Sequence, residues 1–178
     1  GINKATKKIA EIHKAQKTYE VQIRFGAKTP TLDSEGRFLE MKPITHSPKN
    51  RLHHLKKFIG EYKQKIPNFS AHKSQGKNFY ELARNNEVIK ERVKDVSIKK
   101  IKILYSNQNN LGLELDCKTG FYVRAFAEEL ANSLGDIAYA SVIKRLKIGQ
   151  FNQNHAVPYE KILDFSSIND LDTHLITI

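Results

Sequence analysis

The chain has 178 residues, 39% hydrophobic and 28% charged, a balance typical of a globular domain rather than a disordered chain. Its net charge of +11 favours a polyanionic partner, with nucleic acid first and an anionic membrane surface second. The single cysteine excludes an internal disulfide and a thiolate metal cluster. No apolar run is long enough to span a bilayer, so we expect a cytoplasmic protein with no membrane partner.

The first clear element is a strand predicted near the N-terminus, over residues 19–25. Its apolar side chains recur with a period of two, which is typical of a half-buried strand. These side chains are Tyr19, Val21, Ile23 and Phe25. Residues 29–36 then form a polar loop around Asp33, rich in side chains that bond to their own backbone. Asp33 is therefore predicted to close a turn.

A basic segment follows. Ser47 and Pro48 predict the start of a helix, as N-cap and first helical residue, and Gly60 predicts its end. Residues 49–77 contain eight Lys or Arg residues against one acid, Glu61. Aromatic and histidine side chains are interleaved with these cations, a composition that suits an RNA backbone with exposed bases nearby. The alternative is a solvated helix face followed by a loop, and for any single lysine that is the better interpretation.

Residues 111–134 carry the strongest structural signal, a strand that turns sharply into a helix. The strand is predicted by alternating apolar residues and the helix by apolar residues at helical spacing, ending before Gly135. The turn places Tyr122 and Arg124 beside the helix N-terminus, where free amides and the helix dipole favour an anion. The alternative is a packing corner with an arginine that faces water.

Two further strands are predicted on either side of that stretch. Residues 93–105 alternate irregularly, as expected of a strand that shifts phase at a bulge. Residues 138–148 are expected to place Ile143 and Arg145 on one strand face. The opposite face is expected to carry Ala138, Ala140, Val142, Leu146 and Ile148.

The residues alone do not predict a reaction. The chain contains no Walker loop, no GxGxxG and no HExxH, and His53-His54 lacks the spacing of a zinc site. Cys117 falls on the inward side of its strand, which favours a buried, inert thiol. Asp116 is expected to point to the opposite face from Cys117. These observations predict a basic α/β domain that binds nucleic acid.

Four stretches, taken in order, resemble the TruB family of tRNA pseudouridine-55 synthases. They are KTYEVQIRFGAKTPTLDSEG at residues 17–36, IPNFSAHKSQGKNFYELAR at 66–84, CKTGFYVR at 117–124 and VIKRLKIGQF at 142–151. Each stretch is weak alone, but four in sequence are specific. The resemblance implies an α+β pseudouridine synthase fold, a mixed and mostly antiparallel sheet with flanking helices.

The resemblance also implies a domain organisation. Residues 1–157 would form the catalytic-domain portion and residues 158–178 a short C-terminal appendage without a PUA domain. The family's nucleophilic aspartate lies in a G-x-L-D-P-x-A-x-G motif that precedes an A-T-K segment, which residues 5–7 resemble. We therefore expect the motif upstream of Gly1, an N-terminally truncated domain, and no activity from this chain alone.

By the same resemblance, the activity is isomerisation of uridine to pseudouridine at position 55 in the T loop of tRNA, after the base is flipped. Tyr19 would stack on the uracil and help to remove the C5 proton. Arg124 would pair with the missing aspartate, and without it would be an unpaired, partly buried cation. The implied substrate-binding residues are Tyr122, Ile143, Asp33, Lys73 and Arg145.

No cofactor or metal is implied, and the expected partner is the T arm of tRNA, bound by a monomer. Asp33 and its loop would engage that arm. The main alternative is a non-catalytic basic RNA-binding domain that associates with the ribosome or with tRNA. A third interpretation is an interaction domain whose charge serves solubility.

Overall fold

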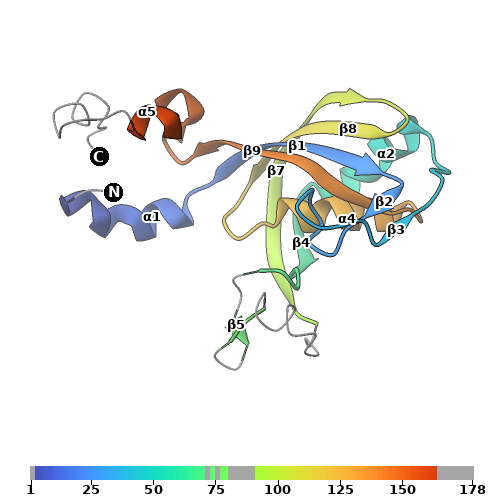
Figure 1. Ribbon diagram of the computed structural model, residues 1–178, viewed down its shortest axis with the longest axis horizontal. Helices are drawn as coiled ribbons and strands as arrows, with labels where there is room; N and C mark the ends of the chain where they lie inside the picture. Colours follow the sequence, from blue (N-terminus) through green and yellow to red (C-terminus); the bar gives the residue numbers. More distant parts are fainter. Residues whose placement is uncertain (1–2, 71–72, 75–76, 80–90, 164–178) are drawn as a thin grey trace.

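The centre of the molecule is one six-stranded antiparallel sheet with the order β10-β9-β1-β8-β7-β4 (Figure 1). The structure is a computed structural model that describes residues 3–70, 73–74, 77–79 and 91–163. The strands are β1 (Lys17–Phe25), β4 (Gly60–Lys65), β7 (Val93–Ser106), β8 (Asn110–Cys117), β9 (Ala138–Ile148) and β10 (Phe151–Asn152).

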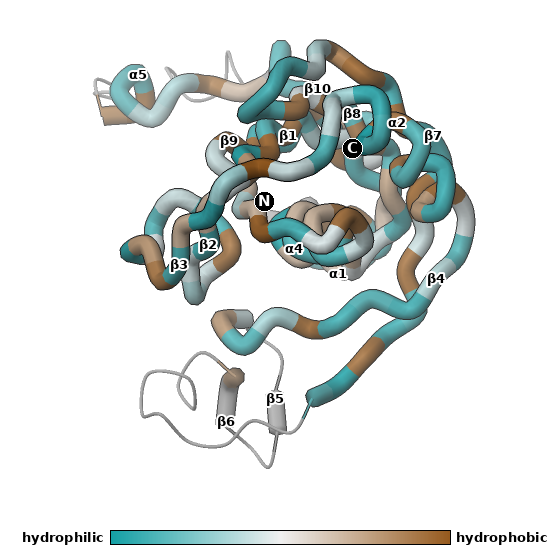
Figure 2. Tube along the Cα trace, turned by 90° about the vertical axis from the view of Figure 1, so that its right-hand side faces the viewer, coloured by the Kyte–Doolittle hydropathy of each residue, from teal (hydrophilic) through white to brown (hydrophobic). Residues whose placement is uncertain are grey.

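Helices and short strand pairs surround this sheet. The helices are η1 (Asn3–Lys8), α1 (Ile9–Lys14), α2 (Pro48–Leu55), η2 (Lys56–Phe58), α4 (Val123–Ser133), η3 (Gln153–His155) and α5 (Tyr159–Leu163). The pairs are β2 (Ala27–Lys28) with β3 (Glu40–Met41), and β5 (Lys73–Ser74) with β6 (Lys77–Asn78). In Figure 1, α1 and α5 lie at one end of the molecule and α2 at the other. Figure 2 shows α4 between β4 on one side and the β2–β3 pair on the other.

The hydrophobic core lies between one face of the sheet and α4. Phe126 and Leu130 of α4 are fully buried against Val21 and Leu113 of the central strands. Each such side chain contributes about 1.5–3 kcal/mol by leaving water. Cys117 also lies in this core, and burial raises the pKa of its thiol to about 12. The prediction of a buried, inert cysteine is therefore confirmed.

Local sequence signals predict most of these elements. The backbone N–H of Asn50 donates to Ser47 Oγ at 3.3 Å, which confirms the predicted cap of α2. Gly135 follows α4 with a φ of 71°, a left-handed conformation that suits glycine at a helix end. The irregularity of residues 93–105 corresponds to two register shifts between β7 and β8. The sequence did not predict α1, α5 or β4.

The predicted faces of β9 are wrong in part, because Ile143 and Arg145 share a face as predicted but it is the face of Ala138 and Ala140 rather than the opposite one. Two register shifts between β1 and β9 change the phase of the strand, because each bulge inserts one extra residue. Ile143 consequently lies opposite Val21 and Arg145 opposite Tyr19, on the α4 face of the sheet. Residues 80–90 and 164–178 lie outside the described residues, so predictions that fall on them stay predictions.

Candidate active site

The first part of the candidate site is the section of the sheet where α4 no longer buries the side chains. Tyr19 of β1 is half-buried there, beside Arg145 and Ile143 of β9. Ile143 is 40% exposed although its cross-strand neighbour Val21 is 0% exposed. The sheet thus presents a tyrosine, an arginine and an aliphatic side chain on one open face.

Tyr19 and Arg145 interact electrostatically. Burial raises the pKa of the Tyr19 phenol, while a hydrogen bond and the positive charge of Arg145 act in the opposite direction. The phenol is therefore protonated at neutral pH, and Arg145 is the group that favours its ionised form. Burial and the nearby charge of Arg145 both lower the pKa of Lys17, which lies two residues before Tyr19 on β1.

The second part of the site is formed by Arg124 in the first turn of α4. Its Nη1 donates to the Thr31 carbonyl and to Asp33 Oδ2, both at 3.2 Å. Its Nη2 donates to the carbonyl of Phe69. The Arg124 and Asp33 side chains are only 23% and 17% exposed. The expectation of an unpaired Arg124 is wrong, because a carboxylate 91 residues away in the chain neutralises it.

The loop around Asp33 holds this carboxylate in place. Asp33 Oδ1 accepts hydrogen bonds from Thr31 Oγ1 at 2.6 Å and from the Glu35 N–H at 3.2 Å. The predicted turn closure by Asp33 is thus confirmed, and the same side chain also binds Arg124. The loop is fixed to the sheet because the Ala140 N–H donates to the Leu32 carbonyl at 2.9 Å. Leu32 has a φ of 65°, a left-handed conformation that is uncommon for a side chain of this kind.

Tyr122 precedes α4 and is held by its backbone. Its N–H donates to Gln64 Oε1 at 2.8 Å, and its carbonyl accepts from Gln64 Nε2 at 3.2 Å. Glu129 supports Gln64 by accepting from the same amide nitrogen and from the Lys65 N–H. The Lys94 ammonium lies 4.7 Å from the centre of the Tyr122 ring. The sequence analysis missed Gln64 and Glu129, because no local pattern marks a polar pair 65 residues apart.

The structure therefore arranges the predicted site residues in two groups. One contains Tyr19, Ile143 and Arg145, and the other contains Arg124 and Asp33. Within the described residues no hydrogen bond or ion pair joins the groups directly, although the Leu32–Ala140 bond ties the Asp33 loop to β9. Lys73 lies on β5, where it pairs with Asn78 of β6.

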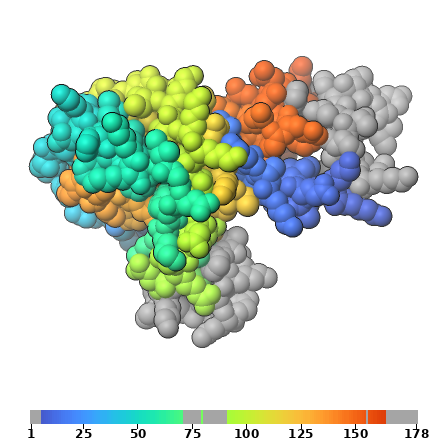
Figure 3. Space-filling model, turned by 180° about the vertical axis from the view of Figure 1, so that it is seen from behind, coloured from blue at the N-terminus to red at the C-terminus, as the bar shows by residue number. Residues whose placement is uncertain are grey.

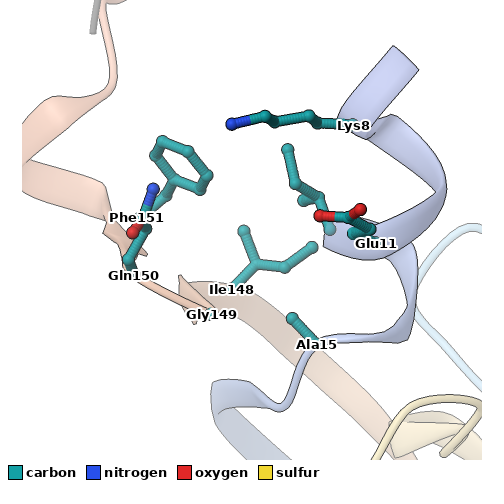
Figure 4. A pocket seen from close by; sticks show the side chains of 8 residues that line it. Lys8, Glu11, Ala15, Ile148, Gly149, Gln150 and Phe151 are labelled. Carbon is teal, nitrogen blue, oxygen red and sulfur yellow. The ribbon is translucent and has the colours of Figure 1, made fainter. Parts of the chain in front are cut away.

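Cavities lie beside both groups. One cavity, of about 470 Å³, lies between α1 and the turn that joins β9 and β10 (Figure 4). It is lined by Lys8, Glu11, Ile12, Ala15, Ile148, Gly149, Gln150 and Phe151. A cavity of about 300 Å³ shares Ile148 and Phe151 with it and reaches Arg145. A third, about 290 Å³, is lined by Phe69, which binds Arg124 through its carbonyl.

The part of the chain that the structure describes lacks two features, a cluster of metal ligands and a membrane-spanning helix. It contains no group of three or more His, Cys, Asp or Glu side chains that could hold a metal ion. None of its helices combines the length and the apolar character needed to cross a bilayer.

Two solved structures share this fold. A Cbf5-Nop10-Gar1 complex matches with a TM-score of 0.65 and 18% identity, over 92% of this chain and 40% of that one. An H/ACA RNP bound to a substrate RNA containing 2′-deoxyuridine matches with a TM-score of 0.64 and 15% identity, over 97% and 41%. The predicted α+β pseudouridine synthase fold with a mostly antiparallel sheet is confirmed.

Sequence relatives narrow the class to one family. Residues 1–123 match the TruB family pseudouridylate synthase (N terminal domain). The tRNA pseudouridine synthase B of Ureaplasma urealyticum serovar 10 is 37% identical over 184 residues, 98% of this chain and 78% of the relative. That of Nitrosococcus oceani is 32% identical over 162 residues, 90% of this chain and 53% of the relative. The chain belongs to the TruB family, and it spans about half the length of several of these relatives.

Proposed function

We propose that this chain carries the substrate-binding and supporting residues of a tRNA pseudouridine synthase that isomerises uridine at position 55 in the T loop. The observation that carries the proposal is the meeting of Arg124 and Asp33, which come from two of the four family-like stretches. Relatives named tRNA pseudouridine synthase B support the substrate class. The partner would be the T arm of tRNA, bound in the cytoplasm by a monomer.

The chemistry assigns a task to each group. The reaction detaches uracil from C1′ and re-bonds it through C5, so the base must leave its stack first. Tyr19 would stack on that base and be placed to remove the C5 proton through its phenolate form, which burial disfavours and Arg145 favours. Ile143 and Tyr122 would line the pocket. Lys73 and the Asp33 loop would contact the RNA.

Arg124 has the capacity to orient a second carboxylate. Guanidinium carries five N–H donors, and within the described residues the hydrogen bonds of Arg124 use Nη1 and Nη2 alone. Its Nε–H therefore remains for a nucleophilic aspartate supplied by the family's G-x-L-D-P-x-A-x-G motif. Asp33 would then hold the arginine while the arginine holds the nucleophile ionised.

The test is tritium release from C5-labelled uridine in a T-stem-loop RNA. We expect this chain alone to bind the RNA without releasing tritium, and a version extended by the family's aspartate motif to turn over. Release by the chain alone would overturn the assignment of the nucleophile. Binding without turnover in both versions would favour the rival function, a non-catalytic RNA-binding domain.

A first prediction concerns Tyr19→Phe in the extended version. Stacking needs only the ring, whereas proton transfer needs the hydroxyl, so RNA affinity should persist while turnover falls about 100-fold or more. Tyr105→Phe is the matched control, because Tyr105 lies opposite Gly112 on the other face of the sheet. Near-normal single-turnover rates for Tyr19→Phe would contradict the proton-transfer role.

A further inference from the structure

The segment α2–η2 carries a stripe of basic side chains on its outer side. Lys49, His53, Lys56 and Lys57 are all exposed, at positions i, i+4, i+7 and i+8, which share one helix face. Arg51 of the same helix points inward instead and is 0% exposed. The four exposed residues thus lie together on the outer side of the segment, and we call them the α2 stripe.

Among the described residues, no acid neutralises the α2 stripe. Residues 41–60 contain no Asp or Glu, and no lysine of the stripe forms an ion pair within the described residues. The first acid beyond the segment, Glu61, is bound by Lys118 at 2.6 Å. Like charges at helical spacing repel, and Lys49 in the first helical turn opposes the helix dipole, whereas Lys56 and Lys57 lie at the C-terminal end, where the dipole favours cations. The stripe therefore adds repulsion between like charges that no acid in the described residues offsets.

The cations on the outer face of the sheet are arranged differently. Lys100 lies opposite Asp116 and Lys102 opposite Glu114 on the neighbouring strand. Lys144 Nζ lies 3.5 Å from Glu20 Oε1 across the β1–β9 ladder. The charges of these three lysines are balanced locally, in contrast to those of the lysines in the α2 stripe.

The position of α2 relates the stripe to the candidate site. His54 Nδ1 lies 3.0 Å from Ser133 Oγ at the C-terminal end of α4, whereas Arg124 lies at the N-terminal end. An α4 of 11 residues separates the two ends by about 16 Å. Figure 3 shows α2–η2 (teal) exposed at one end of the back face, beside β7 (yellow-green).

The side chains of the stripe favour contact with phosphate groups. Its lysines can neutralise phosphates, and its one ring is the imidazole of His53, which is edge-on to His54 at 6.2 Å. Phe58 of η2 is edge-on to Tyr62 and Phe126 at 5.4 Å and 5.2 Å and packs against the core. A surface with three exposed lysines and no Phe, Tyr or Trp suits double-helical RNA better than a single strand.

We propose that the α2 stripe is a second RNA-binding surface, which holds the phosphate backbone of the double-helical stem while the target nucleotide occupies the candidate active site. This proposal rests on the proposed function, since it concerns the same RNA. Its role is affinity and orientation rather than chemistry. It accounts for a stripe of like charges that no acid in the described residues offsets.

The test compares two triple variants with the same change in net charge. Lys49→Gln/Lys56→Gln/Lys57→Gln removes the lysines of the stripe, and Lys100→Gln/Lys102→Gln/Lys144→Gln is the matched control on the outer sheet face. Binding of a T-stem-loop RNA is titrated at several salt concentrations. The stripe variant should lower the log–log salt slope by about 2, because each lost phosphate contact removes about 0.7–0.9. The control should leave the slope unchanged, and both variants should remain folded.

A single-stranded RNA with the loop sequence separates the outcomes further. Its affinity should be nearly the same for the stripe variant and the original chain, since no stem is present. Equal slopes for both variants on the stem-loop would overturn the stripe proposal while leaving the proposed function intact. A flat salt response of the original chain would instead overturn RNA binding itself. Loss of binding to anionic vesicles in the stripe variant, with stem-loop binding intact, would assign the stripe to membranes and overturn the proposal.

Discussion

Arg51 and Arg124 bind their surroundings in the same way but lie in different environments. Both donate to loop carbonyls from distant segments, Asn107 and Gln108 for Arg51 and Thr31 and Phe69 for Arg124. Arg51 is 0% exposed, whereas the Arg124 side chain is 23% exposed.

The acceptors that complete each set also differ. Arg51 Nε donates to the neutral ring nitrogen Nε2 of His46 at 2.7 Å, and its guanidinium lies 4.0 Å above the Phe25 ring. Arg124 instead binds a carboxylate, Asp33. A fully enclosed arginine can only hold the fold together, because no ligand reaches it. A partly open arginine beside a fixed carboxylate can also orient a reacting group.

The largest expected effect is the loss of stability in Arg51→Met. This change leaves two loop carbonyls and His46 Nε2 without their donor, and each buried unsatisfied group costs about 1–3 kcal/mol. We expect the free energy of unfolding to fall by about 3–5 kcal/mol in urea denaturation. Arg24→Met, at an exposed position on β1, is the control and should change it by less than about 0.5 kcal/mol. A similar small loss for Arg51→Met would show that its hydrogen bonds contribute little.

Arg124→Lys should reduce turnover strongly and stability only slightly. Lysine keeps the charge but loses the fork that reaches Thr31, Asp33 and Phe69, so stability should fall by only about 1–2 kcal/mol at this partly open position. Turnover of the version that carries the aspartate motif should fall about 100-fold or more, since the nucleophile loses its partner.

A double-mutant cycle with Asp33→Asn checks the pairing itself. The Arg124→Lys and Asp33→Asn losses of stability should be non-additive by about 1 kcal/mol, as expected for residues in direct contact. Additive losses would show that the ion pair contributes nothing to folding. Normal turnover in Arg124→Lys would remove the orienting role.

The contrast between the two arginines could not be predicted from the sequence. Arg51 stands in a run of basic residues and resembles its solvent-exposed neighbours, and only the folded helix shows that it points inward. The pairing of Arg124 with Asp33 joins residues 91 positions apart, and no local pattern records such a contact. Burial and partnership of charged residues are properties of the tertiary structure.

Elements defined by local rules were predicted better. The alternation of β1, the cap of α2 and the glycine after α4 each depend on neighbouring residues, and each is confirmed. β9 shows the limit of that reasoning, because its bulges arise from pairing with β1 and reverse the faces assigned by alternation. The tertiary pairing thereby placed Arg145 and Ile143 beside Tyr19, where the proposed function needs them.

The smallest expected effect concerns His46, which links Arg51 to Asp136. Because Arg51 Nε donates to His46 Nε2, the ring proton sits on Nδ1, 3.0 Å from Asp136 Oδ2. The contact is electrostatic rather than a well-aligned hydrogen bond, since neither atom completes one within the described residues. Burial lowers the pKa of His46, as do the charges of Arg51 and His54, and Asp136 opposes them.

A lowered pKa means that the unfolded chain gains a proton at His46 before the folded chain does. The contribution of neutral His46 to the free energy of unfolding should therefore be complete above the unfolded pKa of about 6.5. It should decline as the pH falls below that value, by at most about 1.4 kcal/mol per pH unit. His46→Gln keeps an acceptor for Arg51 but cannot titrate, so the free energy of unfolding, measured by urea denaturation, should decline less at acidic pH. His53→Gln, on the exposed side of α2, should leave this acid decline unchanged. If His46→Gln kept the full acid decline, protonation of this enclosed ring would not be what destabilises the Arg51 cluster, and the loss would have to come from Asp136 or other carboxylates gaining protons.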